Sequence, residues 1–232
     1  MKNNFTNTLF TVLSWICILI AFGCVGYYYP QLPEAIPIHF DANGTADNTG
    51  SKLMMWIFPI LLPLLTYFII QWIRKKNVIT MNPPAFQFAM TACMSALSIF
   101  ITYYIVQYTG IIATNQGVDA TQFVDIKYLY LVLGPIFIVL GIFMKGQAPN
   151  QFFGARTPWT LKNDEVWRKT NKMAGDQFQF VGVLLMGITL LKKTIPVNLI
   201  FIILMVFVVI YIYAYSYIVY KNINGTKNGA SN

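Results

Sequence analysis

The chain has 232 residues, of which 56% are hydrophobic and only 10% are charged, and its mean hydropathy is +0.57. Soluble domains carry about 25% charged residues, so this composition excludes a surface that faces water on all sides and indicates an integral membrane protein. The formal net charge of +8 would suit nucleic acid or an anionic membrane. Because the bases lie between apolar runs, the charge favours a role in membrane orientation, without direct nucleic-acid binding.

Six apolar segments are predicted to be transmembrane helices, because about 20 apolar residues cross a hydrocarbon core of about 30 Å. Pro59 and Pro63 should bend the second segment, and Asn82-Pro83-Pro84 should start the third. The predicted fold class is therefore an all-α integral membrane protein. The six segments cover residues 8–28, 53–73, 85–108, 128–144, 177–191 and 195–220.

The fifth segment is short, since 15 helical residues rise only about 22 Å. Flanking Lys192 and Lys193, or a thinner bilayer, would let it span. It could also continue from a helix that starts near Asp164. If it did not cross, the C-terminus would lie on the other side of the membrane.

The distribution of Lys and Arg predicts the orientation. With both termini inside, twelve bases lie on the cytoplasmic side, and four lie outside, namely Lys52, Lys127, Lys192 and Lys193. The inverted orientation reverses this ratio, so the positive-inside rule selects the N-in/C-in topology.

The loop between the first two segments, residues 27–52, should be structured and lie outside. Pro30, Pro33 and Pro37 push the chain toward extended geometry, and Asp41 to Gly44 form a turn signal. We predict an extended segment followed by a turn. Its charged residues make it mildly acidic, so it should face a basic or amphipathic partner. They are Glu34, Asp41 and Asp47 against Lys52.

His39 is the only histidine in the chain. A lone histidine is more often an ordinary hydrogen-bonded residue than a metal ligand. Nearby oxygens of Glu34, Asp41, Asn43 and Asp47 would suit a hard cation. However, Gly44 is at the fourth position of its loop, and an EF-hand loop needs glycine at the sixth. We predict neither a metal nor a cofactor.

The stretch NQFFGARTPWTLKNDEVWRKTNKMAG, Asn150 to Gly175, joins the fourth and fifth segments. Asn163 is a good N-cap, and Asp164 and Glu165 would then offset the positive end of a helix dipole. One face of this helix is apolar and the other mostly basic, which predicts an amphipathic helix on the cytoplasmic membrane surface. The first face carries Trp167, Asn171, Ala174 and Phe178, and the second carries Glu165, Arg168, Lys169 and Lys172.

Two interpretations of this stretch compete. In the first, Trp159 and Trp167 lie at headgroup depth and the bases contact anionic lipid. In the second, the order Arg-Thr-Pro-Trp-Thr with Asn150 and Gly154 before it forms a fixed packed turn. The guanidinium of Arg156 would then bind carbonyls or a carboxylate.

Both polar segments resemble known patterns. The stretch at 150–175 closely resembles the hallmark of the SdpI family of bacterial membrane proteins, with Asn171 where many relatives carry His. The outer loop resembles an uncharacterised domain that often precedes it. The hallmark matches are Asn150, Gly154, Arg156, Thr157, Pro158, Trp159, Thr160, Trp167, Thr170, Asn171 and Gly175. The loop matches are Tyr29, Pro30, Leu32, Pro33, Ile36, Pro37, His39, Phe40, Gly44 and Asp47.

The resemblance implies a multi-pass immunity protein of the bacterial cell membrane, which protects the cell from a secreted, membrane-active Sdp-like peptide toxin. Some such proteins also act as receptors that hold a cytoplasmic transcriptional repressor at the membrane. We expect the outer loop, including Asp41, to contact the toxin and the inner stretch to contact the repressor. A small-molecule transporter or channel is the alternative, although the spans carry no ionisable residue in their middles. No catalytic motif indicates an enzyme.

We divide the chain into four parts on this basis. They are a two-helix unit with the outer loop at 1–80, a central helix pair at 81–144, an SdpI-like unit at 145–222 and a disordered tail at 223–232.

Overall fold

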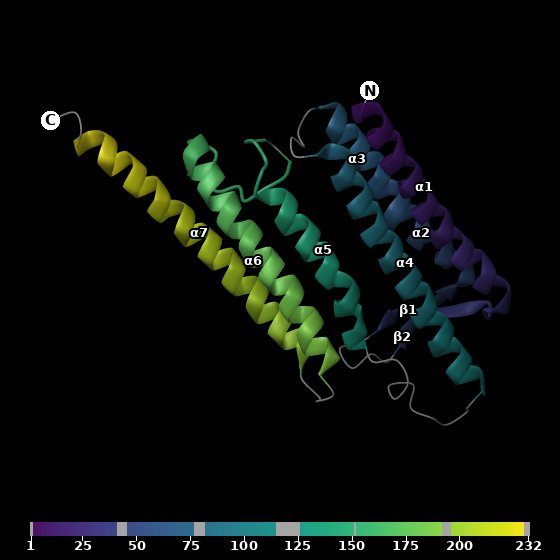
Figure 1. Cartoon of the computed structure of the whole chain (residues 1–232). Helices are drawn as coiled ribbons and strands as arrows, with labels where there is room; N and C mark the ends of the chain where they lie inside the picture. Colours follow the sequence, from purple (N-terminus) through teal and green to yellow (C-terminus); the bar gives the residue numbers. More distant parts are fainter. Residues whose placement is uncertain are drawn as a thin grey trace. The chain divides into compact units, whose positions relative to one another are not determined.

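The computed structural model describes residues 2–40, 46–76, 82–114, 126–150, 152–191 and 196–229. Asp41, Gly44, Lys192 and Lys193 lie outside these ranges. The described chain is mostly helical, with one two-stranded sheet (Figure 1). Its longer helices are α1 (Lys2–Tyr28), α3 (Leu65–Lys75), α4 (Pro83–Thr114), α5 (Leu129–Met144), α6 (Asp164–Leu190) and α7 (Val197–Gly229). Its strands are β1 (Ala35–Phe40) and β2 (Ala46–Ser51).

Five described helical stretches are long and apolar enough to cross a membrane, and α5 is a shorter apolar helix. The chain is therefore a multi-pass membrane protein by the length and composition of its helices. The sixth crossing, through α5, and the N-in/C-in orientation remain predictions. The five stretches are Phe5–Gln31, Lys52–Lys75, Pro83–Gly110, Asp164–Leu190 and Val197–Asn224.

The second stretch is irregular where the sequence predicts a bend. It passes from a 3-10 turn (η2, Lys52–Trp56) through the short α2 (Ile57–Pro59) into a π-helical turn (η3, Ile60–Leu64) before α3. Pro63 lies inside this π turn. Because proline has no N–H to donate to the fourth carbonyl before it, the α-helical ladder is interrupted and the wider turn accommodates the ring.

The prediction of a separate amphipathic helix before the fifth span is wrong, and the alternative, in which the fifth segment continues from a helix that starts near Asp164, is confirmed. α6 is one continuous helix of 27 residues that contains both the amphipathic part and the short apolar part. At the junction of the two parts, α5 supplies partners for the polar residues of α6. The ammonium of Lys145 forms an ion pair with Asp176 and donates to Oε1 of Gln179 at 3.3 Å.

The chain divides into two compact units. Unit 1 comprises Met1–Gln71 and Gln87–Val132, and unit 2 comprises Trp72–Phe86 and Leu133–Asn232. This division follows contacts between residues, whereas the parts proposed from sequence follow motifs. Those motif boundaries remain a proposal. The tail differs from its prediction, since α7 continues as helix to Gly229.

Four glycines bring α5 and α6 of unit 2 into close contact. A Cβ on Gly141 would lie 2.5 Å from the carbonyl oxygen of Gly175, and a Cβ on Gly182 would lie 2.5 Å from that of Gly134. Side chains at these positions would push the backbones apart. Small residues that permit such an approach are a common basis of helix association in membranes, where burial of apolar surface gives little driving force.

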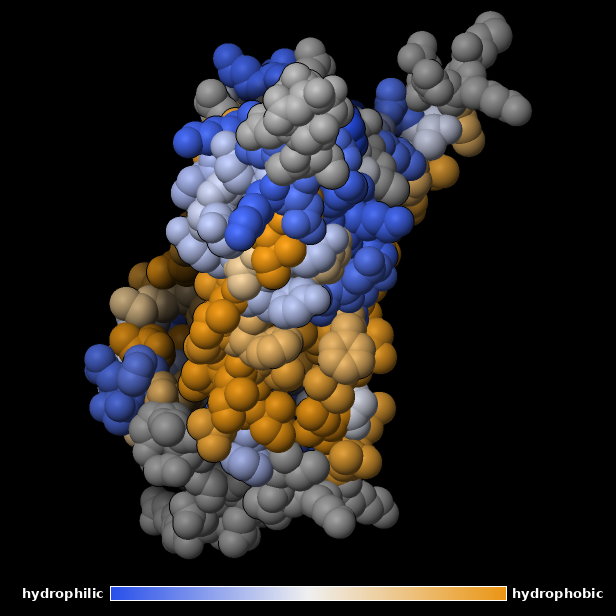
Figure 2. Space-filling view, turned by 90° about the vertical axis from the view of Figure 1, so that its left-hand side faces the viewer, coloured by the Kyte–Doolittle hydropathy of each residue, from blue (hydrophilic) through white to orange (hydrophobic). Residues whose placement is uncertain are grey.

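α6 and α7 lie side by side (Figure 1). The side of the molecule on which α7 lies carries a broad hydrophobic surface, with hydrophilic residues gathered at one end of it (Figure 2). Large apolar side chains along α7 are exposed, which suits contact with lipid and not with water. They include Leu199, Ile202, Ile203, Val206, Phe207, Val209 and Ile210.

Candidate functional site

The segment that is predicted as the outer loop, residues 27–52, contains a β-hairpin in unit 1. β1 and β2 pair antiparallel, with Ala35 opposite Ser51 and Phe40 opposite Ala46. The register shifts between Pro37 and Phe40, where Pro37 cannot donate to the ladder. The predicted extended segment at this loop is therefore confirmed. The predicted turn, with Asp41 and Gly44, lies outside the described residues.

The base of the hairpin is fixed by a hydrophobic cluster. Ile36 from β1 is fully buried with Val25 of α1, Met55 of η2 and Ile105 of α4, and Leu32 completes the cluster. Burial of a Leu, Ile or Val side chain contributes about 1.5–3 kcal/mol. The hairpin is thus held by helices that precede it and helices that follow it in the sequence, and it is not a loose loop.

Polar contacts reinforce this base. The backbone N–H of Lys52 donates to the carbonyl of Glu34 at 3.0 Å, and the Lys52 ammonium pairs with the Glu34 carboxylate at 2.9 Å. The same ammonium lies 5.2 Å from the centre of the Tyr29 ring. Tyr29 therefore has a structural role, while Pro30 and Pro33 are exposed.

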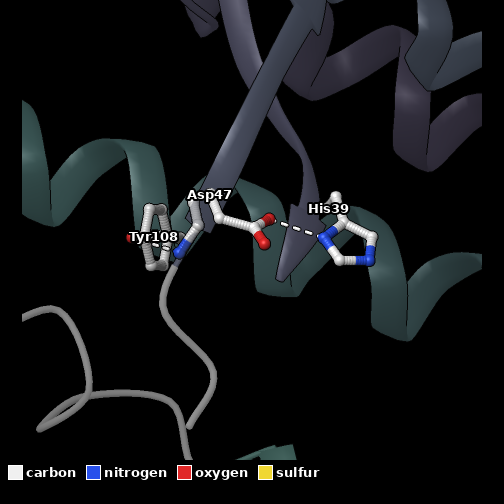
Figure 3. Close-up of polar contacts among 4 residues, drawn as sticks. His39, Asp47 and Tyr108 are labelled. Atoms are coloured by element: carbon white, nitrogen blue, oxygen red, sulfur yellow. Dashed lines mark hydrogen bonds and ion pairs between the residues drawn. The ribbon is translucent and has the colours of Figure 1, made fainter. Parts of the chain in front are cut away.

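Near its far end, the hairpin carries an exposed pair of polar side chains (Figure 3). Nδ1 of His39 lies 2.5 Å from Oδ1 of Asp47, and both side chains are at least half exposed. The sequence interpretation of His39 as an ordinary hydrogen-bonded residue agrees with this contact. In the described part of the chain, no group of three metal-ligating side chains includes this pair.

Two tyrosines of α4 fix the end of the hairpin, and the sequence analysis did not identify them. The Tyr108 hydroxyl accepts a hydrogen bond from the N–H of Ala46 at 3.0 Å, at the start of β2 (Figure 3). Phe40 packs edge-on against Tyr104 and Tyr108, with ring centres 5.1 and 5.3 Å away. The only sign of this role in the sequence is the four-residue spacing of the two tyrosines, which places them on one face of α4.

The stretch from Asn150 to Gly175, which we call the motif segment, forms a packed turn in unit 2 that leads into α6. Oδ1 of Asn150 accepts from the N–H groups of Phe152 and Phe153, and its Nδ2 donates to the carbonyls of Ala148 and Phe153. One side chain thus satisfies four backbone groups where the chain makes neither helix nor sheet.

Gly154 and Asn171 meet at the centre of the turn. Gly154 has φ of +127°, a conformation that only glycine adopts readily. A Cβ there would lie 2.5 Å from Oδ1 of Asn171 and 2.8 Å from the Trp167 ring. Oδ1 of Asn171 accepts from the N–H of Ala155 at 2.7 Å, and its Nδ2 donates to the carbonyl of Trp167 at 3.0 Å.

Trp167 is fully buried, and its indole N–H donates to the carbonyl of Gln147 at 3.0 Å. Trp167 therefore does not contact lipid headgroups as an interfacial belt residue would. The amphipathic pattern explains its burial, since Trp167, Asn171 and Ala174 form the buried face of α6. Trp159 is half-buried against Tyr213 and Tyr217 of α7, with ring centres 4.8 and 5.1 Å away.

Two threonines close the Arg-Thr-Pro-Trp-Thr turn. The Thr160 hydroxyl accepts from the N–H of Thr157 at 2.8 Å and lies 3.0 Å from the carbonyl of Ala155. Asn163 caps α6, because its Oδ1 accepts from the N–H groups of Glu165 and Val166 at 2.9 and 3.2 Å. The predicted cap is confirmed. Thr170 and Gly175 are also buried, the latter against α5.

Arg156 and Pro158 are exposed. In the described residues, the guanidinium of Arg156 has no hydrogen-bond acceptor or carboxylate partner, so the prediction of a fixed guanidinium is wrong. The bases of the predicted basic face of α6 are likewise exposed at Arg168, Lys169 and Lys172. The motif segment therefore combines a buried hydrogen-bonded interior with an exposed cationic surface.

Comparisons with known proteins find family matches for the region of the hairpin and for the region of the motif segment. Residues 147–216 match the SdpI/YfhL protein family, and residues 16–62 match a domain of unknown function, DUF1648. The chain is similar to the immunity protein SdpI of Bacillus subtilis (strain 168), with 26% identity over 228 residues. That alignment covers 98% of this chain and 100% of the relative. No solved structure matches the chain.

Proposed function

Because residues 147–216 match the SdpI/YfhL protein family and residues 16–62 match DUF1648, we propose that the chain is an SdpI-type protein that protects a bacterial cell against a secreted Sdp-like peptide toxin. The observation that carries this proposal is the extent of the similarity to an immunity protein. It runs through 98% of the chain and includes both the hairpin and the motif segment. A shared membrane fold alone would not require both polar segments to be present together.

In this proposal the chain crosses the bilayer six times, with both termini and the motif segment in the cytosol. The distribution of charge within unit 2 supports this sidedness. The indole of Trp72, near the end of α3, packs on Phe152 with ring centres 5.5 Å apart, so the bases that follow Trp72 lie near the motif segment. Cationic residues favour the cytoplasmic side. Those near or within this segment are Arg74, Lys75, Lys145, Arg156, Lys162, Arg168, Lys169 and Lys172.

The hairpin then faces the outer compartment, where it meets the toxin first. Its base is anchored by Ile36 and its far end by Tyr108, so its exposed side chains are presented in a fixed arrangement. Ile38, which precedes His39 in β1, also has a partly exposed side chain. An apolar residue next to a polar pair suits a partner that is itself amphipathic. We assign the toxin contact to this end of the hairpin.

The exposed bases of the motif segment would serve a second, cytoplasmic partner. Arg156 contributes nothing to the hydrogen bonds of the turn that surrounds it, which leaves its five donors available to an acidic or carbonyl-rich surface. Lys162, Arg168 and Lys172 of the same segment are also exposed and cationic. We propose that a transcriptional repressor binds here when the toxin occupies the hairpin.

Protection is tested by expressing the full chain in a toxin-sensitive strain and measuring survival against purified Sdp-like peptides. Survival should rise relative to a strain that makes the N171L variant, in which the motif segment is disrupted. Membrane abundance of both proteins is measured by an epitope tag. Unchanged killing by every peptide, with the wild-type chain abundant in the membrane, would argue strongly against immunity.

A further inference from the structure

A hollow of about 380 Å³ lies in unit 1, between the hairpin and the end of α4. This volume is within the range of binding pockets. None of the described residues that line the hollow is charged, so it suits an uncharged, largely apolar ligand better than an ionic one. The lining includes Ala35, Pro37, Ala46, Thr49, Tyr108 and Thr109.

The hollow lies at one end of a membrane-spanning stretch. Tyr108 and Thr109 are in the last turn of the apolar stretch Pro83–Gly110, which is long enough to cross a bilayer. The hairpin beside it carries the exposed residues Asp47 and Thr49. A membrane-active peptide that lies at the bilayer surface can therefore reach the hollow without leaving that surface.

The outer edge of β2 offers backbone groups beside the hollow. Hydrogen-bonded and non-bonded residue pairs alternate along an antiparallel ladder. Because the N–H of Lys52 donates to the carbonyl of Glu34, Thr49, three residues earlier, is in a non-bonded pair. Its N–H and C=O are therefore directed away from β1. The edge of β1 is less suitable for pairing, because Pro37, the partner of Thr49, has no N–H.

The hydroxyl of Tyr108 supplies a hydrogen-bond donor at the wall of the hollow. This oxygen accepts the N–H of Ala46 at 3.0 Å, and both residues line the hollow. Tyr108 is buried, and among the described residues its hydroxyl proton has no acceptor. A phenolic hydroxyl both accepts and donates, so a backbone carbonyl of a bound peptide would use the donor that remains.

We propose that the toxin binds here as a short extended strand along β2, an inference that rests on the proposed function. The toxin backbone pairs with the N–H and C=O of Thr49, and one of its carbonyls accepts from the hydroxyl of Tyr108. Because side chains alternate between the two faces of a strand, every second one faces the hollow. An apolar side chain there packs against Ala35 and Pro37. Addition of a strand at a sheet edge is a common mode of peptide recognition.

The test measures the affinity of a dye-labelled Sdp-like peptide for the full chain in phosphatidylcholine nanodiscs, by fluorescence anisotropy. A35W, which fills the hollow from an exposed position of β1, should weaken binding about tenfold, which corresponds to about 1.4 kcal/mol. L53W, at an exposed residue of η2 away from the lining, should leave the affinity unchanged. N-methylation of successive residues in the apolar segment of the peptide should weaken binding at every second position, because only alternate N–H groups face β2.

Wild-type affinity of A35W, or an N-methyl series without this alternation, would overturn the inference. A benzophenone amino acid in place of Ala35 identifies the occupant of the hollow directly. A light-induced cross-link to the peptide supports the proposal, whereas a cross-link to phospholipid alone, while the peptide is bound, would assign the hollow to an acyl chain and refute it. If no Sdp-like peptide binds the wild-type chain, the proposed function fails as well. If the peptide binds and A35W has no effect, this inference fails alone.

Discussion

Replacement of Asn171 by Leu should destabilise the motif segment more than any surface change in it. Leu has a similar size but neither accepts nor donates a hydrogen bond. The change leaves the buried N–H of Ala155 without its acceptor at 2.7 Å and removes the donor to the carbonyl of Trp167 at 3.0 Å. Because the site is buried, water cannot replace either partner freely.

The magnitude follows from these two contacts. A buried donor left unsatisfied costs about 1–3 kcal/mol, and a lost intramolecular hydrogen bond costs about 0.5–1.5 kcal/mol. We therefore expect N171L to lower the free energy of unfolding of unit 2 by about 2–4 kcal/mol. Denaturant titration in detergent micelles, followed by Trp fluorescence, measures this because Trp167 is fully buried and accepts the hydrogen bond from Asn171 at its carbonyl.

N171H is the matched control. Neutral histidine offers one acceptor and one donor, so it can repeat both contacts, and its loss of stability should be smaller than that of N171L. Equal stability of N171L and the wild-type chain would show that Asn171 does not hold the turn to α6. The structural role assigned to the motif segment would then be wrong.

Three further changes test other parts of the molecule. G182V should lower stability by about 1–3 kcal/mol, because a Cβ there meets the α5 backbone at 2.5 Å. G187V should not, because a Cβ at that position meets no neighbouring group within 4 Å beyond its own helix backbone and its two chain neighbours. Equal unfolding midpoints of the two variants would refute the close helix contact. Y108F should cost about 0.5–1.5 kcal/mol and speed hydrogen exchange at the amide of Ala46, which loses its acceptor; unchanged exchange would show that this bond does not form. R156Q should leave unfolding within about 0.5 kcal/mol of wild type yet weaken toxin-induced derepression in a reporter strain, and full derepression would exclude Arg156 from the signalling surface.

The sequence predicts the elements of this fold well where a local rule decides them. Asn163 caps α6 because its side chain reaches the free N–H groups of the first turn. Pro63 disturbs the second helical stretch because it lacks a donor. The extended geometry of the hairpin follows from its prolines in the same way.

The sequence predicts less where a distant residue supplies the partner. The apolar pattern of the fifth segment stops at Asp176, and the sequence does not show that the partner of this carboxylate is the ammonium of Lys145 on α5. Trp167 looks like a headgroup-depth residue until the carbonyl of Gln147 is found beside its indole. Arg156 shows the opposite error, since a motif residue expected to be bonded is exposed.

The candidate site, too, divides into residues that local structure explains and residues that it does not. Most motif residues are explained by the turn that they build, with Asn150, Gly154 and Asn171 as its centre. The exposed residues of the motif and of the hairpin are those left for partners. Which side of the membrane each faces depends on the number of crossings, and local physics does not decide this for the short α5.

The sidedness of the hairpin and the motif segment is the central claim, and cysteine labelling in intact cells tests it most directly. Cys17, Cys24 and Cys93 are first replaced by Ser, and N48C or R156C is then introduced at an exposed position. A membrane-impermeant maleimide should label N48C in intact cells and R156C only after the membrane is permeabilised. Labelling of R156C in intact cells with N48C protected would contradict the orientation and the immunity mechanism built on it.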